Sequence, residues 1–153
     1  MIEARSGGQG PYTLDGRVAV ISGGSSGIGA ATARRLAAGG ARIAIGYNAG
    51  RDRAEALAAE LPGAGHIPLF LPMGDSGADR GAAAEVTDRF GRADVLVNSA
   101  GTTRAVPHAD LDALDDETFD RILTTNVRGP FATIRAFASL LRQGGDAVVV
   151  NIS

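Results

Sequence analysis

Short apolar runs alternate with segments of helical period along this chain. The apolar runs predict five strands, at residues 17–22, 41–47, 66–71, 93–98 and 146–152. The periodic segments predict four helices, at residues 27–38, 53–61, 78–90 and 115–142. Strands that are nearly all apolar are typical of a sheet covered on both faces. The pattern therefore predicts an α/β fold in which helices cover both faces of a parallel sheet.

The helix predicted at residues 115–142 is the longest element. Its apolar positions recur at helical spacing and predict one buried face, formed by Phe119, Ile122, Leu123, Val127, Phe131, Ile134, Ala138 and Leu141. No linker divides the chain after residue 14. We therefore expect a flexible segment at residues 1–14 and one domain at residues 15–153.

Composition excludes several classes of function. The 153 residues carry a formal net charge of -2 with scattered basic residues, so no surface for nucleic acid or anionic lipid is predicted. There is no cysteine, and His66 and His108 lack the spacing of metal ligands, so no metal site is predicted. All 15 basic residues are arginine, which excludes lysine Schiff bases and the lysine of a P-loop. With neither a signal sequence nor a run of about 20 apolar residues, we expect a soluble cytoplasmic protein.

A glycine-rich turn, Ser22-Gly23-Gly24-Ser25-Ser26-Gly27-Ile28-Gly29, joins the first predicted strand to the first helix. The N-terminus of a helix presents free N–H groups and a positive dipole end, which together bind a pyrophosphate. We expect Gly23 to permit the tight turn, Gly27 to let a ligand approach the backbone, and Gly29 to let the helix pack closely. The two serines add hydroxyl donors. A merely flexible loop is the alternative, but the flanking strand and helix favour a dinucleotide site.

The chain resembles the N-terminal part of a short-chain dehydrogenase/reductase. That family has Thr-Gly-x-x-x-Gly-x-Gly in its first turn, here with Ser22 in place of Thr, and Asn-Asn-Ala-Gly after its fourth strand, here Asn98-Ser99-Ala100-Gly101. Residues 91–98 and 125–131 are also similar to the family. The resemblance implies a Rossmann-type doubly wound sheet of order 3-2-1-4-5, truncated before the last strands. It also implies hydride transfer between a nicotinamide cofactor and carbonyl or alcohol substrates, as in the 3-oxoacyl carrier-protein reductases.

The end of the second predicted strand indicates which dinucleotide binds. Folds that prefer NAD usually place an acid there for the ribose hydroxyls, whereas this strand ends Gly46-Tyr47-Asn48. Arg51 and Arg53 follow and offer a bidentate partner to a 2′-phosphate, so NADP(H) is predicted in preference to NAD(H). The alternative is that both arginines belong to a solvated helix start. The family's Asp-apolar pair at the adenine is replaced by Pro72-Met73. The cofactor-binding residues that we expect are Ser22, Gly23, Ser25, Ser26, Gly27, Ile28, Gly29, Tyr47, Asn48, Arg51, Met73, Asn98, Ala100 and Gly101.

Asn126 is the residue that the resemblance assigns to the active site, where its main-chain carbonyl holds a water of the proton relay. Pro130 has no N–H for the carbonyl four residues earlier, which is that of Asn126. We therefore expect a local break in the helix and a free acceptor. Alternatively, Asn126 satisfies buried backbone groups.

The family's other catalytic groups are a serine just after the fifth strand and a Tyr-x-x-x-Lys motif. Asn151-Ile152-Ser153 matches the family only up to the residue before that serine, and no lysine follows Tyr12 or Tyr47. We therefore expect a partial member of the family that binds the cofactor and does not reduce carbonyls by itself. The alternatives are a non-catalytic NADP(H)-binding module and a dimerising module, because the helix at residues 115–142 corresponds to one that forms subunit contacts in the family.

Overall fold

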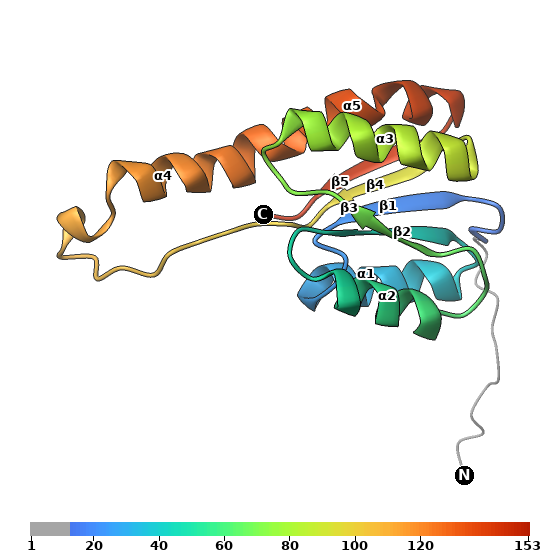
Figure 1. The fold of residues 1–153 in the computed structure, drawn as a ribbon, viewed down its shortest axis with the longest axis horizontal. Coiled ribbons are helices and arrows are strands. Elements are labelled where there is room, and N and C mark those ends of the chain that lie inside the picture. Colours follow the sequence, from blue (N-terminus) through green and yellow to red (C-terminus); the bar gives the residue numbers. More distant parts are fainter. Residues whose placement is uncertain (1–12) are drawn as a thin grey trace, which may run out of the picture.

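A five-stranded parallel sheet forms the centre of the computed structural model, which describes residues 13–153 (Figure 1). The sheet order is β3-β2-β1-β4-β5, with every neighbouring pair parallel. This confirms the predicted fold class and strand order, although each strand begins one or two residues later than predicted. The strands are β1 (Val18–Ser22), β2 (Arg42–Tyr47), β3 (Ile67–Phe70), β4 (Val95–Asn98) and β5 (Val148–Asn151).

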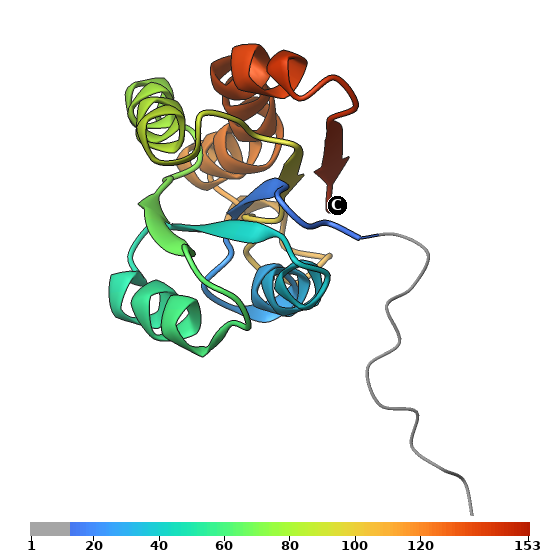
Figure 2. The same cartoon turned by 90° about the vertical axis from the view of Figure 1, so that its right-hand side faces the viewer.

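Helices cover both faces of this sheet. Helices α1 (Gly27–Ala38) and α2 (Arg51–Glu60) lie on one face, and α3 (Ser76–Phe90) and α5 (Gly129–Gln143) lie on the other (Figures 1 and 2). α1 has the predicted bounds, whereas α2 and α3 each begin two residues earlier than predicted. In α3 the reason is Asp75, whose carboxylate caps the helix by accepting from the amides of Gly77 and Ala78 at 2.8 and 3.0 Å.

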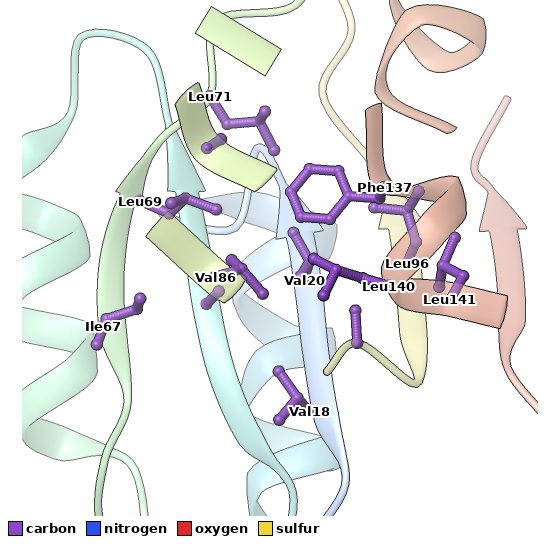
Figure 3. Packing of buried hydrophobic residues seen from close by; sticks show 13 residues of the cluster. Val18, Val20, Ile67, Leu69, Leu71, Val86, Leu96, Phe137, Leu140 and Leu141 are labelled. Atoms are coloured by element: carbon purple, nitrogen blue, oxygen red, sulfur yellow. The ribbon is translucent and has the colours of Figure 1, made fainter. Parts of the chain in front are cut away.

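β1 supplies side chains to both halves of the core. Successive side chains of a strand point to opposite faces of the sheet. Val18 and Val20 therefore pack toward α3 and α5, together with Val86 and Phe137 (Figure 3). Ala19 and Ile21 pack toward α1 and α2. All five residues of β1 are buried, as the unbroken apolar run predicts for a central strand.

The helix predicted at residues 115–142 is divided into three parts. α4 (Asp116–Leu123) is followed by a π-helical turn at Thr124–Arg128 and then by α5. The Gly129 amide closes this turn by donating to the Thr124 carbonyl, five residues earlier. Since Pro130 has no N–H to continue the regular helix, the predicted break is confirmed, in the form of a π turn.

α4 extends beyond the sheet, at the end of the long loop that follows β4 (Figure 1). Its apolar stripe continues into α5 and stays open to solvent, because Phe119, Leu123, Val127 and Phe131 are 50%, 44%, 64% and 63% exposed. The predicted burial of these four side chains was wrong. Helical spacing identifies a shared stripe, but it does not say whether another element lies against it.

β5 is an edge strand. One side pairs with β4, and no further strand follows it within residues 13–153. All four of its residues are exposed, with values between 39% and 52% for Val148, Val149 and Val150. Within the described residues this strand therefore presents apolar side chains and an unpaired ladder edge.

The start of the chain is described from Thr13 onward. The flexible segment predicted at residues 1–14 therefore lies outside the described residues, except for Thr13 and Leu14. Leu14 donates its amide to the Gly39 carbonyl at 2.8 Å and packs against the core on the α1 side.

Asp94 holds the amino ends of the strands together. Its carboxylate is 2% exposed and accepts hydrogen bonds from the Val18 amide at 2.9 Å, from Arg17 Nη1 at 2.8 Å and from Arg92. Arg17 also pairs with Asp146, just before β5, at 2.7 Å. Burial alone would raise the pKa of Asp94, but the bonds from Arg92, Arg17 and Val18 hold it below its ordinary value.

Candidate cofactor site

A cleft of about 580 Å³ opens at the carboxyl ends of the strands, where the sheet order turns from β1 to β4. Open parallel sheets bind their ligands at this end and at this reversal of strand order. Ten of the predicted cofactor-binding residues line the cleft, namely Gly23, Ser25, Ser26, Gly27, Ile28, Tyr47, Asn48, Met73, Ala100 and Gly101. The other lining residues are Ala49, Gly50, Arg53, Leu71, Ser99, Thr102, Arg121 and Thr125.

The glycine-rich turn after β1 forms one side of the cleft. Gly23 has φ +64°, and a Cβ there would lie 2.8 Å from the Ala100 Cα, so only glycine lets the turns after β1 and β4 approach. Gly27 has φ +53°, and a Cβ there would meet nothing within 4 Å. Ser26 precedes α1 and makes no side-chain capping bond. The start of α1 therefore borders open space, which is the arrangement that binds a pyrophosphate.

Two predicted residues of this turn, Ser22 and Gly29, hold the cleft together without lining it. Ser22 is fully buried, and its Oγ accepts from the amides of Ser99 and Ala100 at 3.1 and 3.2 Å. A Cβ on Gly29 would collide with the Gly23 carbonyl, so this glycine lets α1 begin directly against the turn. Both residues thus position the backbone that faces the cleft.

Arg53, in the first turn of α2, lies at the cleft beside the end of β2. A Cβ on Gly50 would collide with the Arg53 guanidinium, so that glycine makes room for it. Arg51 does not line the cleft, because its Nε donates to Glu55 Oε1 at 2.8 Å in an exposed i,i+4 pair. The structure therefore places Arg53, rather than the predicted Arg51, at the cleft. Among the described residues that line it, none is acidic.

Met73 forms another wall of the cleft, in the connection from β3 to α3. This connection packs closely against the start of α5, as a Cβ on Gly129 would lie only 3.0 Å from Met73 Cε. Gly74, with φ +94°, accepts a hydrogen bond at its carbonyl from Arg128 Nη2 at 2.8 Å. The wall of the cleft is thereby joined to the π turn.

Two predicted asparagines lie outside the cleft lining and link neighbouring segments of the chain. Asn98 is 2% exposed and donates its Nδ2 to Asn151 Oδ1 at 2.9 Å, which links β4 to β5. Asn126 makes two bonds of 2.8 Å to the Thr102 backbone, accepting from the amide and donating to the carbonyl. Asn126 is itself exposed, so its side chain fastens the loop after β4 to the π turn. The role expected of its main-chain carbonyl stays a prediction.

Sequence reasoning missed the side of the cleft that α4 and the π turn contribute. Arg121 and Thr125 line the cleft together with Thr102. The apolar stripe lies on another face of this helix and gives no sign of these two residues. The spacing of Arg121 and Thr125 could have indicated them, because residues four apart share a helix face and Thr125 immediately precedes Asn126.

Other features of the described chain point away from a second site. A hollow of about 560 Å³ lies near the amino ends of β1 and β2, lined by residues that include Leu14, Arg35 and Gly40. It is remote from the carboxyl ends of the strands, where ligands bind in such sheets. Within residues 13–153 no three side chains of metal-ligating type gather. None of the helices described is both long and apolar enough to cross a membrane.

Known proteins share this arrangement of motifs and fold. Residues 17–153 match the profile of the family described as short chain dehydrogenase. D-threitol dehydrogenase of Mycolicibacterium smegmatis is 39% identical over 145 residues, which cover 93% of this chain and 54% of that protein. The chain spans about half the length of the curated relatives it matches.

Solved structures agree with the sequence relatives. A short chain dehydrogenase from Burkholderia cenocepacia J2315 in complex with NADP is 40% identical with a TM-score of 0.77, covering 85% of this chain and 53% of that one. A short-chain dehydrogenase/reductase from Serratia marcescens BCRC 10948 is 34% identical with a TM-score of 0.82, covering 93% and 57%. Since the family profile, the sequence relatives and the fold coincide over nearly all of the described residues, the chain belongs to the short chain dehydrogenase family.

Proposed function

We propose that this chain binds NADP(H) in the cleft above β1 and β4, as the cofactor-binding part of an oxidoreductase that acts on carbonyl or alcohol substrates. The observation that carries the proposal is the cleft itself, in which the start of α1, the serines Ser25 and Ser26 and the guanidinium-bearing Arg53 border one open space. A pyrophosphate fits the start of α1, because Gly27 leaves room for it and backbone amides supply donors. When bound, NADPH would supply a hydride to a carbonyl substrate, and NADP⁺ would accept one from an alcohol.

The choice of NADP(H) over NAD(H) rests on charge at the end of β2. Arg53 lies at the cleft there, and its guanidinium can bind a 2′-phosphate with two parallel bonds. No acidic residue among the described lining competes for the ribose hydroxyls. A matched relative of known structure was solved in complex with NADP, which supports the same choice for this chain.

The test compares two arginines that lie two residues apart. Arg53→Ala removes the guanidinium at the cleft, whereas Arg51→Ala removes one that is paired with Glu55 on the surface. A charge-assisted hydrogen bond is worth about 1.5–3 kcal/mol, so Arg53→Ala should weaken NADP⁺ binding roughly 10- to 100-fold. NAD⁺ binding should change little in either variant. Titration calorimetry measures both ligands, and equal effects of the two substitutions on NADP⁺ would refute the assignment of Arg53.

Binding without turnover is the behaviour that we propose for the chain by itself. The sequence has no lysine, so neither of its two tyrosines has the lysine neighbour that the family's proton donor uses. NADPH oxidation should therefore stay at the buffer rate with a panel of ketones, while the same sample binds NADPH. Substrate-dependent oxidation would contradict this proposal and leave the cofactor site intact.

A second candidate function is self-association through the exposed stripe on α4 and α5. Phe119, Leu123, Val127 and Phe131 expose apolar surface along one continuous face, and such surface favours a protein partner. We propose a second copy of the chain as that partner. Sedimentation should show a dimer that Phe131→Glu dissociates, whereas Leu111→Glu, at an 84% exposed position outside the stripe, leaves it intact.

A further inference from the structure

Asp79 is a carboxylic acid buried between two helices. It lies on α3, is 0% exposed, and faces α5. Its Oδ1 lies 3.3 Å from Thr133 Oγ1, whereas its Oδ2 is buried without a hydrogen-bond partner among the described residues. A charged carboxylate has acceptor positions on both oxygens, so this site satisfies only part of what the charged form requires.

Thr133 connects Asp79 to the wall of the cofactor cleft. Its Oγ1 lies 3.1 Å from the Gly129 carbonyl and 3.6 Å from Met73 Sδ. Met73 lines the cleft, and Gly129 lies so close to it that a Cβ would approach Met73 Cε to 3.0 Å. A continuous set of contacts therefore leads from Asp79 through Thr133 to Met73.

The hydroxyl of Thr133 has one proton, so it can donate to the Asp79 carboxylate or to the Gly129 carbonyl but not to both. Two arrangements of these hydrogen bonds are therefore possible. When Asp79 is neutral, its own O–H can donate to Thr133 Oγ1, and Thr133 can donate to the Gly129 carbonyl. When Asp79 is charged, the Thr133 proton must turn toward the carboxylate, and Gly129 loses that donor. Removing the Asp79 proton thus rearranges the contacts at the start of α5, next to Met73.

The surroundings of Asp79 shift its protonation equilibrium toward the neutral form. Burial raises the pKa of Asp79, and the neighbouring charge of Asp75 acts in the same direction. The bond from Thr133 and the charges of Arg128 and Arg135 oppose this rise but do not cancel it. Both arginines already have partners, since Arg128 donates to the Gly74 carbonyl and Arg135 lies 3.4 Å from the Ser76 hydroxyl.

We propose that Asp79 is a positioning residue that acts through Thr133 on the Met73 wall of the cleft, and that loss of its proton loosens this wall and weakens dinucleotide binding. The inference rests on the proposed function for its effect on binding. The contact between Asp79, Thr133 and Met73 is testable in the ligand-free chain.

The ligand-free test uses methionine as a reporter. The sequence contains two methionines, Met1 and Met73, so methyl-¹³C-methionine labelling supplies one signal at the cleft, assigned with Met73→Leu. We expect the Met73 methyl shift to titrate with a midpoint above the ordinary aspartate value of about 3.9. Asp79→Asn, which imitates the neutral acid, should abolish this titration. A Met73 signal that titrates equally in Asp79→Asn overturns the positioning role.

The binding test compares NADP⁺ affinity at one pH below and one pH above the midpoint of the Met73 titration. The 2′-phosphate itself titrates near pH 6, so the measured quantity is the affinity of the wild type divided by that of Asp79→Asn. This ratio should fall at least about fivefold from the lower to the higher pH, the lower end of typical coupling between sites. Thr133→Ser keeps the hydroxyl and should keep the pH dependence, whereas Thr133→Val should remove most of it. Cooperative melting checks that each variant is folded.

The possible failures are distinguishable. A constant ratio in proteins that bind NADP⁺ overturns the inference and leaves the proposed function standing. Absence of NADP⁺ binding in the wild type and in Asp79→Asn at both pH values overturns the proposed function, and the Met73 titration then decides the positioning role alone.

Discussion

Asp94→Asn tests whether the amino ends of the strands depend on one buried carboxylate. The substitution keeps the shape of the side chain and one acceptor for the Val18 amide, but it removes the charge that faces Arg17 and Arg92. Removing one partner of a fully buried ion pair costs about 3–5 kcal/mol. Arg17 and Arg92 keep 32% and 39% of their side chains exposed, so water compensates part of the loss. We therefore expect a decrease of about 2–3 kcal/mol in the free energy of unfolding.

Asp146→Asn is the matched control. Asp146 accepts from the same Arg17 at 2.7 Å but is 73% exposed. An exposed ion pair is worth about 1 kcal/mol or less, so this variant should stay close to the wild type. Urea unfolding followed by circular dichroism near neutral pH measures both variants. Equal stability losses in the two variants would refute the argument from burial.

The pH dependence provides a second check on Asp94. Its pKa is lowered in the folded chain, so its stabilising contribution is complete above the unfolded value of about 3.9 and is lost as the pH falls through the folded value. The stability difference between wild type and Asp94→Asn should therefore be constant near neutral pH and shrink below about pH 4. A difference that grows on acidification would contradict the assigned sign.

Three further predictions follow from the turns and edges of the sheet. Gly23→Ala should lower the free energy of unfolding by about 2 kcal/mol or more, because φ is +64° and the Cβ would lie 2.8 Å from Ala100 Cα. Gly81→Ala, on the open face of α3, should instead raise the free energy of unfolding by about 0.5–1 kcal/mol. Urea unfolding measures both variants. Asn126→Ala removes both bonds to the Thr102 backbone, so hydrogen exchange at the Thr102 amide should become faster, and unchanged protection would contradict the proposed fastening of the loop. Val149→Lys places a charge on the exposed edge strand β5 and should reduce light scattering of concentrated samples of this chain; unchanged scattering would contradict a role of this edge in association.

Much of the fold follows from local sequence. The apolar run of β1, the glycine-rich turn and the helix with the predicted bounds 27–38 are set by neighbouring residues, because strand burial, turn conformation and helix start are local properties. The resemblance to a family then supplied the strand order, which local patterns do not contain. Most of the residues expected at the cofactor occur in these local motifs, and ten of them line one cleft.

The tertiary structure decided which of two similar side chains faces which neighbour. Arg51 and Arg53 are both plausible partners for a phosphate in the sequence, but the direction in which α2 leaves β2 places only Arg53 at the cleft. The stripe that includes Phe119 and Phe131 looks like a core face, yet α4 extends beyond the sheet and leaves it exposed. Asp79 gives no signal in the sequence, because its burial depends on the packing of α3 against α5. The sequence by itself thus determined the elements and their motifs. Only the tertiary structure decided which neighbour each side chain contacts, because that neighbour lies far away along the chain.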